Sequence, residues 1–407
     1  MWGRSSERLI VANLQGMNSS RAVSALKILP TSALKSISLE TSRLFPKRGK
    51  GKKLFNLDLH VSVIRDITMG LTRKEVEVTS WSISRHNHMF RNFFTAPDPV
   101  RHINAWNWRQ LDEKSISKFL KHYKRHLDQY DGFIVTHTPV FHQIFESLGR
   151  PILIINSTRY ESPHTNNLDK WRQLDQSLTE SVKNGQSHIY SNNAADSKYL
   201  EYFTGLKSEI VPSLCDYTGA TWDNSRADRV YLANRIEPRL QNRLDLLQTW
   251  KSSVEVFGPR FSWAQLQTIN AVFIIPYNVS TMQLFELATA GIPVVVPSKR
   301  FLTELFSDSL ALQEITNYKI EKLTIDELDA KNPNNYRSAE FLKFWLDSAD
   351  FYNHDLMPNV RTVDSFEELD SLSLISHDTD ASRRLASRNE LYGELRSNML
   401  SSFLENV

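Results

Sequence analysis

The stretch Asn270–Pro297, NAVFIIPYNVSTMQLFELATAGIPVVVP, decides the fold of this chain. The apolar run over Ala271–Ile275 predicts a buried strand, and the closing IPVVVP predicts another. Between them a helix is expected from Ser280 to Gly291, because Ser280 and Gln283 have capping-box spacing and a glycine closes it. Strand, helix and strand in this order form a βαβ unit, so the stretch predicts a parallel sheet.

Glu286 is the one charged residue of this helix, and a carboxylate buried without a partner is costly. The stretch resembles the donor-binding element of GT-B glycosyltransferases, which are two-domain enzymes that use nucleotide sugars. The resemblance implies that the backbone amides of Ser280, Thr281 and Met282 hold the diphosphate. It also implies that Glu286 binds the ribose hydroxyls. A helix N-terminus suits an anion because it offers unpaired N–H groups and the positive end of the dipole.

One departure and one alternative accompany this resemblance. Many retaining members of the family carry a further glutamate eight residues before the ribose glutamate, and Asn278 occupies that place here. We keep Asn278 as a donor-binding candidate. The alternative is an ordinary βαβ unit, such as any doubly wound domain contains.

Length and composition indicate a globular protein of about two domains, since the 407 residues are 41% hydrophobic and 23% charged. The net charge of +3 is unevenly spread, because residues 1–54 carry 11 Lys/Arg against 2 Asp/Glu. We therefore expect residues 1–54 to be a flexible basic arm. Its role is open between an organelle-targeting peptide, a contact with anionic membrane or polymer, and a plain extension.

The sequence also favours a cytoplasmic location. No stretch approaches the roughly 18 apolar residues of a membrane span. Cys215 is the only cysteine, so an internal disulfide is excluded and a reducing compartment is favoured. Glycosylation sequons begin at Asn156 and Asn278, but both fall at strand ends where a glycan would obstruct a ligand.

Alternating strands and helices predict an α/β fold in two halves, and the GT-B resemblance implies that these are two Rossmann-like, doubly wound domains facing a cleft. We expect an N-terminal, acceptor-side domain over 55–215 and a nucleotide-sugar domain over 228–380. A final helix over 381–407 is expected to cross back to the first domain, as the GT-B resemblance implies. The expected strands cover 54–61, 75–84, 133–136, 151–156, 188–191, 209–212, 230–233, 254–257, 271–275, the run after Pro293 and 359–363. The expected helices cover 62–71, 112–129, 141–148, 167–182, 194–204, 240–252, 280–291, 339–352, 365–372 and 381–404.

Polar side chains gather where the first strand ends, in DLHVS. Ligands of open parallel sheets lie beyond the carboxyl ends of the strands. Asp58, His60 and Ser62 share one face there, and Asp66 follows one helical turn later. His60 is the preferred general base because imidazole titrates near neutral pH. Asp66 is a further catalytic candidate. The alternative for His60 is a structural hydrogen bond at the sheet edge.

Three further residues of the first domain follow strands and point to the same cleft. His137 follows the strand over 133–136 and is a catalytic candidate. Arg159 is an acceptor-side candidate because its planar fork matches phosphate or carboxylate, the alternative being a salt bridge to Glu161. Asn192 could bind sugar hydroxyls or serve as a turn residue.

In the second domain, Arg235 follows the strand over 230–233. Retaining GT-B enzymes carry an arginine here and a lysine a few residues on, and the pair neutralises the leaving diphosphate. This resemblance implies that Arg235 and either Arg239 or Arg243 bind the donor, because charge builds on the leaving phosphate. Gly258 is expected to let the backbone approach the nucleotide base.

Trp106 and Trp108, together with Tyr123, are candidates for an aromatic platform under a sugar ring, although packing in the core is the commoner use of such residues. Phosphate-binding glycine loops and paired cysteine motifs are missing from the sequence. No D-x-D follows a strand as a metal ligand would. We therefore expect neither a metal nor a cofactor.

These features together predict a metal-independent glycosyltransferase for hexosyl or related transfer. Its partners would be a UDP- or GDP-linked sugar as substrate and an acceptor that the sequence does not name. Stereochemistry is open, because Asn278 and the missing lysine weaken the retaining pattern while His60 suggests an inverting base. Two alternatives are a nucleotide-sugar epimerase of the same fold and a non-catalytic protein that binds carbohydrate or anionic polymer.

Overall fold

The computed structural model describes residues 51–85, 97, 99–223, 225–232, 254–255, 261–316, 328–369 and 379–407. Lys52–Val407 forms one compact unit. Nearly all of the expected basic arm lies outside the described residues, so its role stays a prediction. Also outside them are Arg235, Arg239, Gly258 and the helix expected over 240–252.

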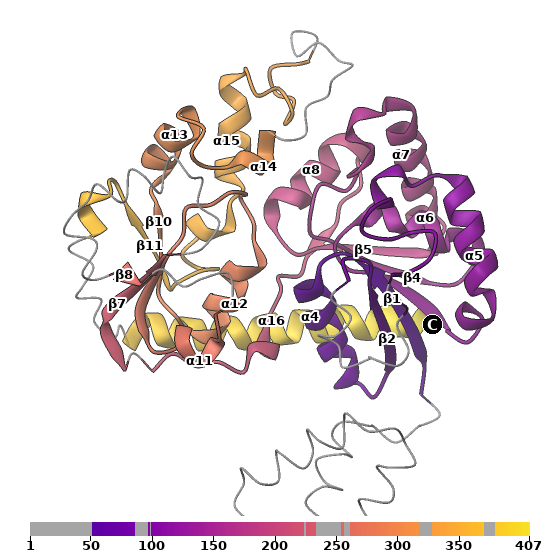
Figure 1. Cartoon of the computed structure of the whole chain (residues 1–407), viewed down its shortest axis with the longest axis horizontal. Helices are drawn as coiled ribbons and strands as arrows, with labels where there is room; N and C mark the ends of the chain where they lie inside the picture. Colours follow the sequence, from indigo (N-terminus) through magenta and orange to yellow (C-terminus); the bar gives the residue numbers. More distant parts are fainter. Residues whose placement is uncertain are drawn as a thin grey trace, which may run out of the picture. The chain divides into compact units, whose positions relative to one another are not determined.

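The first half of this unit is built on a parallel sheet (Figure 1). In the described residues it has six strands, in the order β2-β1-β3-β4-β5-β6. They run over Lys53–Asp58 (β1), Glu77–Ser82 (β2), Gly132–Val135 (β3), Ile152–Asn156 (β4), Ser187–Ser191 (β5) and Glu209–Ile210 (β6). β3 and β4 are buried along their whole length, and this is why they appear in the sequence as continuous apolar runs.

The second half has its own parallel sheet, with five strands among the described residues in the order β11-β10-β9-β7-β8. They run over Arg226–Leu232 (β7), Val254–Glu255 (β8), Ile269–Phe273 (β9), Val294–Pro297 (β10) and Val360–Val363 (β11). β9 and β10 lie side by side, with Val272 opposite Val294. The βαβ unit predicted from Asn270–Pro297 is therefore confirmed.

Helices cover both sheets (Figure 1). The longer ones among the described residues are Val61–Thr72 (α4), Glu113–Leu127 (α5), Leu168–Lys183 (α7), Ala194–Thr204 (α8), Met282–Ala290 (α12), Lys299–Ser307 (α13), Ala339–Asp347 (α15) and Thr379–Asn406 (α16). Single turns lie at Trp108–Gln110 (η2), Pro139–Phe141 (η3), His142–Phe145 (α6), Glu146–Leu148 (η4), His164–Asn166 (η5), Asp216–Thr218 (η6), Trp263–Leu266 (α11), Gln313–Thr316 (α14) and Asp350–Tyr352 (η8). Two doubly wound α/β halves, as expected, make up the unit.

The start of α12 differs from the sequence prediction. Thr281 is the N-cap, so the helix begins at Met282, and no side chain caps its N-terminus. The predicted capping box of Ser280 and Gln283 is therefore wrong. The other end is confirmed, because Gly291 adopts the left-handed conformation with φ of 74°.

Two other differences concern the second half. The helix expected over 339–352 stops at Asp347, and a separate turn, η8, follows it. Two helices that sequence analysis did not predict, α13 and α14, lie between β10 and α15. α13 has a strong cap, since the Ser298 side chain accepts from the Phe301 N–H group.

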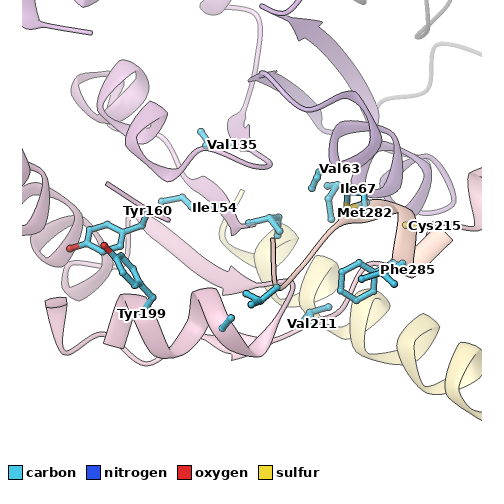
Figure 2. Packing of buried hydrophobic residues seen from close by; sticks show 14 of the residues in the cluster. Val63, Ile67, Val135, Ile154, Tyr160, Tyr199, Val211, Cys215, Met282 and Phe285 are labelled. Atoms are coloured by element: carbon cyan, nitrogen blue, oxygen red, sulfur yellow. The ribbon is translucent and has the colours of Figure 1, made fainter. Parts of the chain in front are cut away.

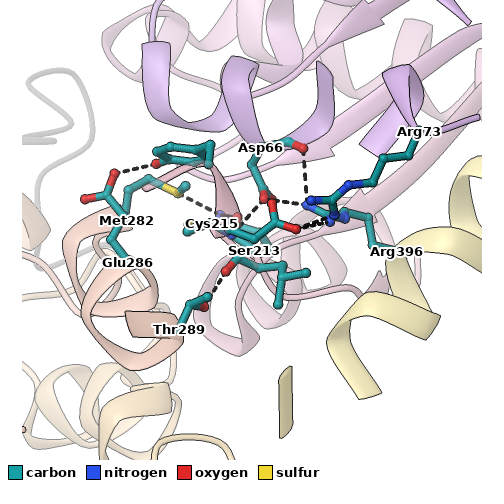
Figure 3. Close-up of polar contacts among 12 residues, drawn as sticks. Asp66, Arg73, Ser213, Cys215, Met282, Glu286, Thr289 and Arg396 are labelled. Carbon is teal, nitrogen blue, oxygen red and sulfur yellow. Dashed lines mark hydrogen bonds and ion pairs between the residues drawn. The ribbon is translucent and has the colours of Figure 1, made fainter. Parts of the chain in front are cut away.

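α16 packs against both halves, as predicted, with contacts to α4 and to α12 (Figure 1). It approaches α4 closely at Gly70, where an added Cβ would lie 2.8 Å from Leu400 Cδ1. Arg396 of α16 donates to Asp66 of α4 at 2.8 Å and to Asp216 at 3.0 Å (Figure 3). Asp216 belongs to the linker, the segment that connects β6 of the first half to β7 of the second. The helix thus joins α4 and the linker through a buried ion cluster.

An apolar junction lies where α4, the linker and α12 meet. Figure 2 shows Val63 and Ile67 of α4 near Met282 and Phe285 of α12, with Cys215 of the linker beside them. All five side chains are buried. Burying side chains of this size stabilises the fold by roughly 1.5–3 kcal/mol each relative to exposure.

Across the described ranges, no helix combines the length and apolarity that a membrane span requires.

Candidate functional site

The topology of the two sheets fixes where a ligand should bind. In the first sheet β1 lies between β2 and β3, so the chain reverses its direction of winding between β1 and β3. In the second sheet β7 lies between β8 and β9, which places the reversal between β7 and β9. Open α/β sheets bind ligands in the crevice at such a switch point, beyond the carboxyl ends of the strands.

A cavity of about 510 Å³ lies at these strand ends. Its volume is within the usual range for a small-molecule site. Its wall takes residues from both halves of the unit: Leu59, His60, Val63, Trp108, Arg109, His137, Thr138, Ser157, Thr158, Ser162, Pro163, Thr165, Asn166 and Asn192 from the first, and Tyr277, Asn278, Ser280, Thr281, Met282 and Glu314 from the second.

Two imidazoles dominate the first wall. His60 follows β1 and is the N-cap of α4, while His137 follows β3. Their rings stack with centroids 5.1 Å apart and an interplanar angle of 24°. Burial lowers the pKa of His137 to about 4, so this ring is neutral at pH 7. His137 Nδ1 lies 2.9 Å from the Thr138 hydroxyl.

Asp58 holds the two histidine loops together from beneath the wall. One carboxylate oxygen accepts N–H groups from Thr136, His137 and Thr138 at 2.9–3.1 Å, and the other accepts from Leu59 at 2.6 Å. Burial raises the pKa of Asp58, and these hydrogen bonds oppose the rise. Asp58 does not line the cavity, so its predicted place beside an acceptor is corrected to a support for the loops that carry the imidazoles.

The second wall is formed by the start of α12 and by the loop before it. Ser280, Thr281 and Met282 all line the cavity. Because no side chain caps α12, the positive end of this helix is directed at the cavity without a side-chain acceptor on it. This local structure arises because the apolar β9 stops at a proline-containing loop, after which MQLFELATA resumes helical spacing.

Asn278 and Glu314 meet on the same wall. The Asn278 amide donates to the Glu314 carboxylate at 3.4 Å, and its oxygen accepts the Val279 N–H at 2.8 Å. The Glu314 N–H in turn donates to the Tyr277 carbonyl at 3.0 Å. Among the described residues that line the cavity, Glu314 is the only carboxylate and Arg109 the only guanidinium.

Asn192 lies where the two walls meet. Its amide lies 3.3 Å from the Ser213 hydroxyl and 3.7 Å from the Met282 sulfur of α12. The prediction placed Asn192 on the acceptor side, and the structure places it in the cavity wall next to the helix start.

Four other predicted residues do not line the cavity. Asp66 is buried and pairs with Arg396 at 2.8 Å, so its predicted catalytic position is corrected to the ion cluster on α16. Glu286 accepts hydrogen bonds from the Tyr217 hydroxyl and, at 3.2 Å, from the Ser62 hydroxyl. Glu286 therefore joins α12 to α4 through Ser62 and to the linker through Tyr217. Burial raises the pKa of Glu286 to about 7.

Arg159 is the fourth of these residues and braces α14. It is 4% exposed and donates to the Ile315 carbonyl at 2.6 Å. Its guanidinium also lies 4.5 Å from the centre of the Trp345 ring. Arg159 thus packs against α14 and Trp345 and does not face an acceptor. A planar guanidinium stacks on an aromatic ring as readily as it binds an anion.

Sequence reasoning missed several residues of the wall. Arg109 and Asn166 lie on the three-residue turns η2 and η5, which are too short for a periodicity to mark a cavity-facing position. Glu314 comes from α14, a four-residue turn that the sequence pattern did not reveal. The only available signal was the tryptophan pair, of which Trp108 lines the cavity and Trp106 does not. Within the described part of the chain, no group of three or more His, Cys, Asp or Glu is placed to hold a metal, and the expectation of metal independence stays a prediction.

Comparisons with known proteins find likenesses to solved structures. No family model matches the chain, and no curated protein sequence matches it. The glycotransferase of kitacinnamycin aligns with 87% of this chain and 98% of its own, at 11% identity and a TM-score of 0.44. A UDP-GlcNAc 2-epimerase from Neisseria meningitidis, bound to UDP-GlcNAc, covers 86% of this chain and 100% of its own, at 11% identity and a TM-score of 0.42. The spinosyn rhamnosyltransferase SpnG with thymidine diphosphate covers 86% and 96%, at 11% identity and a TM-score of 0.34. With scores this low, these likenesses by themselves assign no activity.

The chain's own topology decides the fold. Two parallel sheets present their switch points to one cavity, and α16 packs against both halves. The fold is GT-B-like. In this GT-B-like unit the first wall offers a proton acceptor and the second offers a helix N-terminus for an anion. The arrangement suits a reaction in which a hydroxyl loses a proton while an anionic group departs.

Proposed function

We propose that this chain transfers a glycosyl group from a nucleotide sugar to an acceptor hydroxyl. One observation carries the proposal: the two switch-point loops meet on one cavity, with the imidazole of His60 on one wall and the uncapped start of α12 on the other. A nucleotide sugar needs an anion site for its diphosphate, and the acceptor needs a base. Both are within one cavity of suitable size.

The donor diphosphate binds at Ser280, Thr281 and Met282, where backbone N–H groups and the helix dipole favour negative charge. As the glycosidic bond to the diphosphate breaks, the electron pair leaves with the phosphate, and the same dipole stabilises the charge that develops. Arg235 and Arg239, which we propose from sequence as donor ligands, would add positive charge to the leaving group. Gly258 would border the base.

His60 acts as the general base. It takes the proton from the acceptor hydroxyl while the oxygen attacks the anomeric carbon, so one displacement inverts the configuration. His137 is a poor proton acceptor at pH 7 because burial lowers its pKa to about 4. As a neutral ring it serves instead as a hydrogen-bonding partner beside His60, with Thr138 fixing its orientation.

Nucleotide binding and transfer can be separated experimentally. Thermal shift with UDP, GDP, dTDP and ADP should show stabilisation by at least one nucleotide, worth about 2.7 kcal/mol when its concentration is 100 times Kd. With the corresponding nucleotide sugar, the protein should release nucleotide slowly to water, and NMR of the released sugar should show inverted anomeric configuration. Absence of stabilisation by every nucleotide would refute the proposal.

The same measurements test the alternatives. Conversion of the nucleotide sugar into its epimer, without release of nucleotide, would favour an epimerase that shares the fold. Nucleotide binding without any turnover, in a protein that still binds carbohydrate, would favour a binding module. His60→Ala separates these outcomes further, since only the transferase depends on this base for nucleotide release in the presence of an acceptor.

A further inference from the structure

The part of the first wall formed by residues 108–109 and 157–166 has an unusual composition. It combines one aromatic ring and one guanidinium, those of Trp108 and Arg109, with the hydroxyl and amide groups of Ser157, Thr158, Ser162 and Asn166. The remaining apolar side chains of the first wall are three, namely Leu59, Val63 and Pro163. Such a surface offers hydrogen bonds across most of its area.

The loop that carries Trp108 is rigidly anchored. Val100, Ile103 and Leu111 on either side of it are each at most 2% exposed. Between them, Asn107 accepts the Asn104 N–H at 2.8 Å and donates to the His102 carbonyl at 2.9 Å. A tryptophan held this way presents its ring with little loss of conformational entropy when a ligand binds.

Trp108 itself packs against the core. Its ring meets Phe141 in a T-shaped contact with centroids 6.1 Å apart. The guanidinium of Arg109 lies over the same ring, 5.0 Å from its centre, so an aromatic ring and a cation are stacked at this part of the wall. Aromatic faces of this kind accept the C–H surfaces of a sugar ring, while guanidinium N–H groups donate to its hydroxyls.

We propose that the acceptor is a saccharide and that Trp108 and Arg109 form its platform. The role of the saccharide as an acceptor rests on the proposed transferase function. Binding of saccharide to the platform does not depend on transfer. A sugar places hydroxyls around a weakly polar ring, so it can satisfy Ser162 and Asn166 while its ring lies on Trp108. A flat apolar acceptor would displace the water that hydrogen-bonds to these polar groups and would offer no hydrogen bonds in its place. Leaving polar groups without partners is costly.

Saturation-transfer NMR on the full chain tests the platform directly. The probes are maltotriose, cellotriose and triacetylchitotriose, with 4-methylumbelliferone as an apolar hydroxylated competitor. We expect at least one trisaccharide to bind and 4-methylumbelliferone not to displace it. Trp108→Ala should weaken that binding about tenfold, and Trp108→Phe should restore most of it, because an aromatic face is retained.

Trp106→Ala is the matched control. Trp106 lies two residues away in the same loop, is 64% exposed and does not line the cavity, so its removal should leave saccharide binding unchanged. Asn166→Ala provides a second test that does not disturb the core, since this side chain is exposed; we expect a threefold to fivefold weakening. Binding by none of the three saccharides, or binding that Trp108→Ala leaves unchanged, overturns the proposal.

Failure of this inference is distinguishable from failure of the proposed transferase. One outcome is thermal stabilisation by a nucleotide and glycosyl transfer to 4-methylumbelliferone, with no saccharide binding in the NMR experiment. This outcome would support the transferase and refute the saccharide acceptor. Saccharide binding that requires Trp108, in a protein that no nucleotide stabilises, would keep the platform and refute the transferase. Both signals in one protein support both proposals.

Discussion

The two walls of the cavity are built by different means. The first wall consists of side chains on loops, and those loops are held by side-chain acceptors such as Asp58, which binds four backbone N–H groups. The second wall consists mainly of a backbone feature, the start of α12, which no side chain caps. The first wall therefore depends on residue identity, whereas much of the second depends on main-chain geometry.

This difference assigns different chemistry to the walls. Proton transfer and recognition of hydroxyls require particular side chains, so they belong to the first wall. Binding of a phosphate needs oriented dipoles and positive charge, which a helix N-terminus partly supplies whatever its side chains are. Substitutions should thus reduce turnover on the first wall and nucleotide affinity on the second.

The largest effect is expected at His60. His60→Ala removes the proposed base, and transfer should fall by about 10²–10³. Nucleotide affinity should stay within about twofold, because the helix N-terminus is untouched. Rapid-quench turnover and calorimetric nucleotide titration measure the two quantities. Equal losses of turnover and of nucleotide affinity would mean that proton transfer and nucleotide binding are not separated between the two walls.

A charge at the start of α12 should affect the opposite quantity. Ser280→Asp places a carboxylate where the diphosphate binds, so nucleotide affinity should fall about tenfold. The same carboxylate should stabilise the helix by about 0.5 kcal/mol, so the melting temperature should rise. Ser338→Asp, at the start of the equally long α15, is the control, since α15 does not line the cavity. A similar drop in affinity in both variants would reflect net charge alone.

Glu314 belongs to the second wall, which otherwise consists mainly of backbone groups, but it acts through its side chain. It therefore tests whether side-chain identity also matters on the second wall. Glu314→Gln keeps the size of the side chain and removes the only cavity carboxylate among the described residues. We expect nucleotide-sugar affinity to fall about fivefold while nucleotide affinity is unchanged, because a carboxylate accepts sugar hydroxyls more strongly than an amide does. The ratio of the two affinities is the measurement, and an unchanged ratio would exclude Glu314 from sugar binding.

The smallest effect concerns Glu286, which joins the walls from outside the cavity. Its pKa is about 7 in the fold, against about 4.5 when exposed, so the folded state holds the proton more tightly. This group contributes stability at low pH, and that contribution is lost as the pH rises through 7. Between pH 6 and pH 7 the free energy of unfolding of Glu286→Gln should therefore rise by about 1 kcal/mol relative to that of the natural protein.

Urea unfolding of both proteins at the two pH values measures this difference. Nucleotide affinity of the same variant gives a second result. If affinity falls, Glu286 contacts the ribose as the GT-B resemblance implies, which would require it to leave Tyr217 and Ser62. If affinity holds, the carboxyl serves the junction of α4, the linker and α12.

The sequence predicted the sheets well because buried parallel strands and their helices follow simple periodicities. The run Ala271–Ile275 and the glycine at 291 gave β9 and the end of α12 directly. His60 and His137 were predicted as cavity residues because topology places strand ends there, whereas the start of α12 was predicted from the GT-B resemblance. The positions of Asp66, Arg159 and Glu286 were not predictable. Arg159 follows β4, while Asp66 and Glu286 lie within α4 and α12, and in each place a charged side chain can turn into the packing as readily as into the cavity. Glu314 was not predicted as a cavity residue, because a four-residue turn is too short to show a helical periodicity of apolar residues.

The buried pair of Asp66 and Arg396 has a consequence for how the molecule acquires its structure. Its partners are 330 residues apart in the chain, and Leu400 and Phe403, both fully buried, follow Arg396 on the same helix. The first half therefore keeps an uncovered apolar surface and an unneutralised Asp66 until residues from far downstream are synthesised. Contacts of such long range slow folding and prolong exposure to aggregation. Shortening α16 should thus lower the yield of folded protein more than it changes the architecture of either sheet.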